Sequence, residues 1–589
     1  MSNPHRLALS ALALVLSMTL PALMAACSKP SESGIPTPPV ASSSPKAAAA
    51  TPPTDHVDTG IAWRQASTDA DVDAAFALAR SERKPVFVYW GAKWCPPCNQ
   101  VKATLFNRQD FIERSRAFVP VYVDGDSPGA QKLGARFKVS GYPTMLLFNP
   151  QGVELTRLPG EVEAERYTQV LTLGMNAQRP VKDVLALALA QVKAAPGRSP
   201  SVGPPQAGLI PPGDRSPLSA TEGSSLTAND WRLLAFYSWD TDQQQLVPKN
   251  GVPALLEQLA DACPADATEI ATRLRLKALA AVDVKAPAKP DAAAQAMLLK
   301  VLADTPTARA YMDVLTNSAP DITRALSAKG TPQRADLLAA FDVALKRFEA
   351  DTTLSRADRM AALIAQVDLA MIDTSKPEGA ATKAARPKLP EALLADIREQ
   401  TARADREITD GYERQAVITS AAYLLERAGL GAESDTLLKA NLAKSHSPYY
   451  LMSELASNAK ARGDKTGALR WYEEAFDKSE GPATRLQWGS SYVTALVELG
   501  PQQESRIEKA AAQLLTEAAK QPDAFYERSG RSLQRVGAKL QVWNRSGAHG
   551  AAIQRLQMQL DGVCNALDAN DPKRANCLGL LKPAAKAVA

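Results

Sequence analysis

The chain has 589 residues, of which 45% are hydrophobic, and its 68 Lys and Arg residues against 63 Asp and Glu residues give a formal net charge of +5. This length predicts about two to four domains. So small a net charge gives no reason to expect a nucleic-acid partner, which calls for a strongly basic face, and six cysteines do not form the dense pattern of a disulfide-rich mini-protein.

Residues 1–26 have the pattern of a secretory signal peptide. Arg6 precedes an apolar run over residues 7–20, and small residues follow before Cys27. This order is typical of a secretory signal, and the run is short for a membrane-spanning helix, which needs about 20 residues. The residues before Cys27 resemble a bacterial lipobox, although Met24 stands where Leu is usual. The resemblance implies cleavage before Cys27 and lipid chains on it; plain secretion and an uncleaved anchor are the alternatives.

Residues 27–58 are rich in Pro, Ser and Ala, so they contain too little apolar surface to fold by themselves. We expect this segment to be a disordered tether between the lipid and the first domain. Ser28 follows Cys27 in place of the aspartate that favours inner-membrane retention in some bacteria. This favours the outer membrane over the inner one, on the periplasmic side of the envelope.

Strands and helices alternate over residues 59–180. Apolar β-rich runs predict the strands, and residues with helical spacing predict the helices between them. The expected strands are 85–90, 118–124, 144–148 and 153–158, and the expected helices are 69–83, 129–138 and 163–175, with another that continues after Cys98. This alternation predicts an α/β fold with a central sheet flanked by helices.

Two motifs lie at the ends of these strands. The motif WCPPC occupies residues 94–98 after the first expected strand, and GYPT at residues 141–144 leads into a later one. Together with the order of the elements they resemble the thioredoxin superfamily, and residues 102–111 are most similar to its envelope thiol:disulfide interchange domains. The resemblance covers about residues 60–178. It implies a thioredoxin-like fold in which Pro143 follows a cis peptide bond and faces the cysteine pair.

Cys95 and Cys98 are expected to carry redox chemistry. Two intervening residues on the first turn of a helix bring both sulfurs within disulfide reach, which requires Cα atoms roughly 4.4–6.8 Å apart. Cys95 would lie at the helix N-terminus, whose dipole favours the thiolate. We expect Cys95 to attack a substrate disulfide and the more buried Cys98 to resolve the mixed disulfide.

Two features moderate this chemistry. Pro96 and Pro97 carry no N–H, so mainly the amide of Cys98 remains to stabilise the Cys95 sulfur, and we expect a moderate stabilisation of the thiolate. Thioredoxins have a buried carboxylate six residues before the first cysteine, where this chain has Tyr89. That carboxylate assists proton transfer from the buried cysteine, so its absence argues against efficient thioredoxin-style reduction but allows exchange.

Three residues around the pair have expected roles in substrate binding. Pro143 would present the backbone of Tyr142 beside the sulfurs, where a substrate strand could pair with it; the alternative is a simple turn proline. Trp94 would be either a platform that faces the substrate or a packing residue.

Other chemistries fit the cysteine pair poorly. A zinc site needs about four ligands, whereas this domain supplies two cysteines and no histidine. Attachment of haem requires a histidine directly after the second cysteine, where Asn99 stands. A Cys–His protease would also need a histidine. We expect no metal and no organic cofactor, because the cysteine pair is itself the redox group.

From residue 181 the pattern becomes helical. We expect a helix and a linker rich in Pro, Gly and Ser over residues 181–224, and an all-helical domain over residues 225–589. Ser355 with Asp358 resembles a capping pair before a helix at 360–370. One apolar helical face comprises Leu337, Leu338, Phe341, Leu345 and Phe348.

A repeat follows in this helical region. Gly429 and Gly463 lie 34 residues apart, and so do Pro448 and Pro482. This period, with its small residues, resembles tetratricopeptide repeats, which implies helical hairpins stacked into a solenoid. Only two units are clear, so helical pairs without a regular superhelix are the alternative.

Three cysteines lie in the helical part. Cys564 and Cys577 are close in sequence and could bridge a C-terminal hairpin in an oxidising compartment. Cys263 is left over, either as a buried thiol or as a partner of one of the other two.

Together these features predict a membrane-tethered periplasmic thiol:disulfide oxidoreductase, of reductase or interchange type, with a helical module that binds a protein partner. Its substrates would be envelope proteins with cysteines or disulfides, and its electrons would come from a membrane donor. The alternative is a lipoprotein scaffold whose helical repeats bind a protein partner and whose redox chemistry is secondary.

Overall fold

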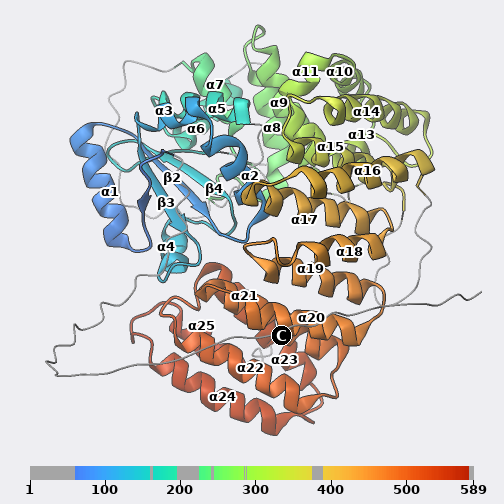
Figure 1. Ribbon diagram of the computed structural model, residues 1–589. Helices are drawn as coiled ribbons and strands as arrows, with labels where there is room; N and C mark the ends of the chain where they lie inside the picture. Colours follow the sequence, from blue (N-terminus) through green and yellow to red (C-terminus); the bar gives the residue numbers. More distant parts are fainter. Residues whose placement is uncertain are drawn as a thin grey trace, which may run out of the picture. The chain divides into compact units, whose positions relative to one another are not determined.

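The computed structural model describes residues 60–158, 164–194, 225–239, 244–283, 286, 288–374 and 389–582. All of these residues belong to one compact unit of the chain (Figure 1). The expected signal peptide, Cys27, the tether and most of the expected linker before residue 225 lie outside the described residues.

The N-terminal part contains a mixed sheet of five strands in the order β1-β3-β2-β4-β5. Strands β1 and β2 run parallel to β3, β4 runs antiparallel to β2, and β5 runs antiparallel to β4. The strands are β1 (Arg64–Gln65), β2 (Val86–Gly91), β3 (Val119–Asp124), β4 (Thr144–Phe148) and β5 (Glu154–Leu158). The predicted α/β sheet is therefore confirmed, and β1, too short to give a periodic pattern, is added at its edge.

Alternate residues of β2 face two different hydrophobic clusters. Val86, Val88 and Trp90 pack with α1 and α4, whereas Phe87 and Tyr89 pack with the helices on the other face of the sheet. The helices of the first face are α1 (Asp69–Glu82) and α4 (Ala130–Arg136), and those of the second are α2 (Pro96–Val101), the π-helix η1 (Lys102–Phe106), α3 (Gln109–Ser115) and α5 (Ala164–Met175). Helices thus cover both faces of the sheet.

The described residues after the sheet form helices and no strand, which confirms the predicted helical region. These elements are α6 (Val181–Ala194), α7 (Ala228–Phe236), the 3₁₀ helix η2 (Lys249–Gly251), α8 (Val252–Ala262), α9 (Thr268–Ala280), α10 (Ala292–Ala303), α11 (Thr305–Ala310), α12 (Met312–Asn317), α13 (Ala319–Leu326), α14 (Pro332–Ala350), α15 (Arg356–Ala370), α16 (Glu391–Glu407), α17 (Gly411–Arg427), α18 (Gly431–Asn441), α19 (Pro448–Ala461), α20 (Lys465–Lys478), α21 (Pro482–Leu499), α22 (Glu504–Ala519), α23 (Glu527–Trp543), α24 (Gly550–Asn565) and α25 (Arg574–Gly579).

Local sequence signals set several of these helix boundaries. The Ser355 hydroxyl accepts the backbone N–H of Asp358 at the start of α15, as the capping pair predicts. Pro448 and Pro482 are the first residues of α19 and α21, where a missing N–H costs no helical hydrogen bond. Because α19 and α20 precede α21, the 34-residue spacing corresponds here to one pair of consecutive helices.

Candidate functional site

The two cysteines lie where β2 gives way to α2. Cys95 is the N-cap residue of α2, and Pro96 is the first helical residue. A disulfide joins Cys95 to Cys98, with the Cα atoms 5.2 Å apart. The backbone N–H of Cys98 donates to the Cys95 Sγ at 3.3 Å. The amide that remains after two prolines therefore points at the sulfur that the helix N-terminus favours as a thiolate.

The GYPT loop packs on the hydrophobic cluster that contains the cysteine pair, through Tyr142. The Tyr142–Pro143 peptide bond is cis, and Thr144 pairs with Trp90 at the end of β2. The rings of Tyr142 and Trp94 approach to 6.5 Å between centroids. The structure thus brings together Trp94, Cys95, Cys98 and the Tyr142–Pro143 segment.

Trp94 is buried and is tied to a buried carboxyl group. Its indole N–H donates to Asp126 Oδ2 at 3.2 Å. The backbone N–H of Thr484, at the start of α21, donates to Asp126 Oδ1 at 2.6 Å, and the Thr484 hydroxyl bonds the other oxygen. Burial and, to a smaller extent, the neighbouring Asp124 raise the pKa of Asp126 to about 7, against the hydrogen bonds of Thr484.

Three residues of the helical part lie over Trp94. The Tyr450 ring stacks on it, with centroids 6.0 Å apart and planes 16° apart. The Trp488 ring meets it edge to face at 5.1 Å. The Arg528 guanidinium lies 4.2 Å from the Trp94 ring centroid and 5.2 Å from that of Tyr142. Sequence reasoning missed these residues and Asp126, because no local pattern links positions so far apart in the chain.

Tyr89 occupies the position of the missing carboxylate. Its ring packs against Phe106 at 4.8 Å and Tyr122 at 5.4 Å between centroids, and its hydroxyl donates to the Cys98 carbonyl at 3.4 Å. Burial raises the pKa of the Tyr89 hydroxyl far above its usual value. The hydroxyl therefore stays protonated near neutral pH and cannot act there as a base.

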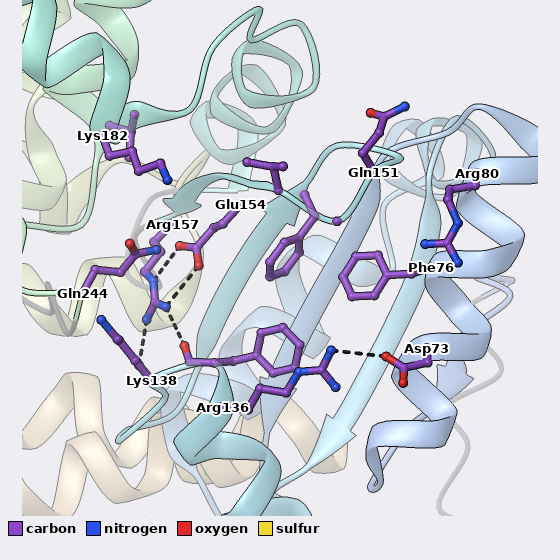
Figure 2. A pocket seen from close by; sticks show the side chains of 15 residues that line it. Asp73, Phe76, Arg80, Arg136, Lys138, Gln151, Glu154, Arg157, Lys182 and Gln244 are labelled. Atoms are coloured by element: carbon purple, nitrogen blue, oxygen red, sulfur yellow. Dashed lines mark hydrogen bonds and ion pairs between the residues drawn. The ribbon is translucent and has the colours of Figure 1, made fainter. Parts of the chain in front are cut away.

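A cavity of about 680 Å³ lies away from this site. It is lined by Phe76 and Phe148, which belong to the cluster on the sheet face opposite Cys95 and Cys98. Figure 2 shows that Arg157 pairs with Glu154 and Arg136 with Asp73 along its wall. The cavity is therefore separate from the cysteine site, and these ion pairs neutralise part of the charge along its wall.

The remaining cysteines fall into a second pair and a single thiol. Cys564 in α24 is joined to Cys577 in α25 by a disulfide, with Cα atoms 5.7 Å apart. Cys263 is free and half-buried, and burial raises the pKa of its thiol to about 11. Cys263 is therefore poorly suited to thiolate chemistry at neutral pH.

No three His, Cys, Asp or Glu side chains in the described ranges are grouped so that they could hold a metal ion. None of the helices among these residues has the length and hydropathy that a membrane span requires.

Part of this chain is similar to known proteins. Residues 72–174 match the family described as a thioredoxin-like domain. The thiol:disulfide interchange protein DsbD 1 of Pseudomonas aeruginosa is 32% identical over 106 residues, which is 17% of this chain and 18% of that protein. The thiol:disulfide interchange protein DsbD of Pseudomonas fluorescens is 29% identical over 112 residues, covering 18% of this chain and 19% of the relative.

The chain therefore spans less than a fifth of the length of these curated relatives. The matched segment contains the Cys95–Cys98 pair, the Tyr142–Pro143 bond and four of the five strands. The chain thus carries a thioredoxin-like domain, similar to part of the thiol:disulfide interchange proteins, followed by a helical region.

Proposed function

We propose that this protein is a thiol:disulfide oxidoreductase held by a lipid on Cys27 at the periplasmic side of a bacterial membrane, with the outer membrane favoured. Its substrates are envelope proteins with cysteines or disulfides. The observation that carries the proposal is the Cys95–Cys98 disulfide at the N-terminus of α2, with the Cys98 amide directed at the Cys95 sulfur. The similarity to interchange proteins supports the same chemistry.

In the reducing direction the pair starts as a dithiol. The Cys95 thiolate attacks one sulfur of the substrate disulfide, so that a Cys95–substrate disulfide forms and the other substrate sulfur leaves as a thiolate. Cys98 then loses its proton and attacks the Cys95 sulfur. The second substrate thiolate leaves, the Cys95–Cys98 disulfide forms, and two electrons have passed to the substrate. A membrane dithiol donor restores the reduced pair by the same steps in reverse.

Trp94, Tyr142 and Pro143 form the substrate-binding side of this site in our proposal. Pro143 has no N–H and fixes the loop, which leaves the backbone of Tyr142 to pair with an extended substrate segment. Because Tyr89 cannot accept a proton near neutral pH, deprotonation of Cys98 has no carboxylate assistance from that position. This favours slow resolution and interchange over rapid thioredoxin-style reduction.

The equilibrium reduction potential of the Cys95–Cys98 pair, measured in glutathione buffers, tests this function. A value near −270 mV, that of thioredoxin, supports a reductase that needs a donor, and a value near −120 mV supports an oxidant. Failure of the pair to form a disulfide in any buffer would exclude exchange chemistry.

A scaffold function is the second candidate, because helices of the C-terminal part pack over the cysteine site. In that case the helices, arranged as tetratricopeptide-like repeats, bind a protein partner and the redox chemistry is secondary. The Cys95→Ser/Cys98→Ser variant separates the two functions. If partner assembly and phenotype match those of the unaltered protein, the scaffold function holds; if both are lost with the fold intact, the enzyme function holds.

A further inference from the structure

Cys95 is almost completely enclosed. It exposes 2% of its surface and Cys98 none, although Cys95 stands at the end of a helix. Both sulfurs belong to a hydrophobic cluster that also contains Tyr449, Met452 and Trp488 of the helical part. Part of the cover over the expected nucleophile therefore comes from α19 and α21, and α17 packs against α2, the helix that contains Cys98.

The expected substrate-binding side is enclosed as well. Arg528 of α23 lies over the rings of both Trp94 and Tyr142. The Arg528 backbone N–H also donates to Gln131 Oε1 at 2.9 Å. An extended segment that pairs with the Tyr142 backbone would have to enter where this arginine lies. The enclosure thus affects substrate pairing as much as sulfur attack.

Polar contacts hold much of this cover in place. Asp126 bonds Thr484 of α21, the backbone N–H of Gln131 donates to Asp523 before α23 at 2.9 Å, and His446 before α19 contacts the Lys93 carbonyl at 3.1 Å. Polar groups of this kind can exchange protein partners for water, which offsets part of the cost of exposing the apolar side chains between these surfaces.

Substrate attack on a disulfide requires contact between two sulfur atoms, and the closed arrangement leaves almost none of Cys95 exposed for this contact. We propose that the surface formed by α19, α21 and α23, with Tyr450, Trp488 and Arg528 at its centre, is a reversible cap on the dithiol. Exchange takes place only in a minor open form in which this cap has moved from Trp94 and Tyr142. The proposal rests on the proposed function and assigns the helical part a gating role in it.

A substitution at Gly481 that adds a Cβ offers a way to force the cap away from Asp126. Its φ is +87°, and a Cβ added there would lie 2.9 Å from the Cβ and the Cγ of Asp126. Gly463 also has a positive φ of +81°, but an added Cβ would meet nothing within 4 Å. Gly481→Ala therefore combines backbone strain with a clash at the cap, and Gly463→Ala is a control for a Cβ at positive φ without a clash.

The test measures alkylation of Cys95 by iodoacetamide in the full chain carrying Cys27→Ser, Cys98→Ala and Cys263→Ser. Each rate is divided by the rate of the same variant in concentrated urea. We expect the native rate of the starting chain to be at least about tenfold below its urea rate, because the closed form must open first. Gly481→Ala should raise the native rate about tenfold or more, and Gly463→Ala less than about twofold.

Thr484→Val keeps the test decisive if Gly481→Ala fails to fold. It removes one hydroxyl hydrogen bond to Asp126 with little change of shape, and loss of such a bond should raise the native rate about fivefold. Native alkylation as fast as in urea, or a rate in Gly481→Ala or Thr484→Val no higher than in Gly463→Ala, would overturn the cap.

Exchange of the intact pair with glutathione, measured in the same cap variants with both cysteines restored, separates the cap from the proposed function. Faster exchange in the opened variants supports both. Equal exchange rates in all variants reject the cap and leave the function. Faster alkylation of Cys95 with no disulfide exchange rejects the function and leaves the cap.

Discussion

Asp126 accepts the indole N–H of Trp94 at 3.2 Å, and Trp94 immediately precedes Cys95 in the chain. The same carboxyl group accepts two hydrogen bonds from Thr484 of the helical part. One buried side chain therefore joins the residue next to the reactive pair to the helices that cover it.

The ionisation of Asp126 makes the stability of the closed form depend on pH. Its pKa of about 7 lies above the ordinary carboxyl value because it is buried and because Asp124 is close, while Arg528 and the donors of Thr484 oppose the shift. An acid with a raised pKa in the folded form binds a proton more tightly there, so stability falls as pH rises between about 4 and 7.

Asp126→Asn, which keeps the shape but cannot ionise, should remove this loss. We expect the difference in Tm between the variant and the unaltered protein to be more positive at about pH 8 than at about pH 5. Each kcal/mol of stability that the unaltered protein loses should shift this difference by a few degrees. Thermal unfolding at both values measures this. An equal Tm difference at both pH values would show that Asp126 does not titrate in this range.

Removal of the Tyr89 hydroxyl should change the chemistry little. It is neutral near pH 7 and makes a single 3.4 Å hydrogen bond to the Cys98 carbonyl. We expect Tyr89→Phe to exchange with glutathione within about twofold of the normal rate, with an unchanged pH profile. Tyr122→Phe, at the half-buried tyrosine stacked on Tyr89, is the control. If the exchange rate of Tyr89→Phe, but not that of Tyr122→Phe, lost its dependence on pH on the acidic or the basic side, the hydroxyl would have a role in proton transfer.

The unequal positions of the two cysteines predict unequal trapping. Cys98→Ala leaves Cys95 at the helix N-terminus without a resolving thiol, so mixed disulfides with glutathione or protein should accumulate. Cys95→Ala leaves only the enclosed Cys98, which should trap at least about tenfold less. Mass spectrometry before and after reduction measures both. Equal trapping by the two variants would contradict the assignment of Cys95 as the attacking residue.

The second disulfide should stabilise the C-terminal helices. Cys564 and Cys577 are 13 residues apart and join α24 to α25. Replacing both by Ala should lower the free energy of unfolding by about 2–4 kcal/mol, since the unfolded chain loses a constraint and the buried site loses its bridge. Thermal unfolding followed by circular dichroism measures the loss. Cys263→Ala is the control; an equal effect there would show that the bridge contributes nothing specific.

The sequence predicts the sheet well because local patterns are strong there. Thr144–Phe148 has the predicted bounds of β4, and Asp69–Glu82 ends one residue before the predicted end of α1. Arg64–Gln65 escaped prediction, because pairing with β3 and not periodicity makes it a strand. The cysteine motif likewise has a local signature, which places Cys95 at the start of a helix.

The surroundings of the cysteines could not be predicted in the same way. Arg528 reaches Trp94 from a position more than four hundred residues later in the chain, and nothing near Arg528 in sequence distinguishes it from the other arginines of an amphipathic helix. Trp488 is apolar and has the spacing of a core residue, and it is indeed buried. Such contacts depend on how the helices stack on the sheet, and this arrangement leaves no trace in local composition.

The burial of Cys95 acts on small molecules as well as on proteins. A cysteine residue with 2% of its surface exposed is shielded from peroxide and glutathione, so its oxidation state changes slowly even when the surroundings change quickly. The pair then equilibrates only slowly with the ambient thiol pool. Its oxidation state therefore persists after each reaction with a partner that reaches the pair, until the next such reaction.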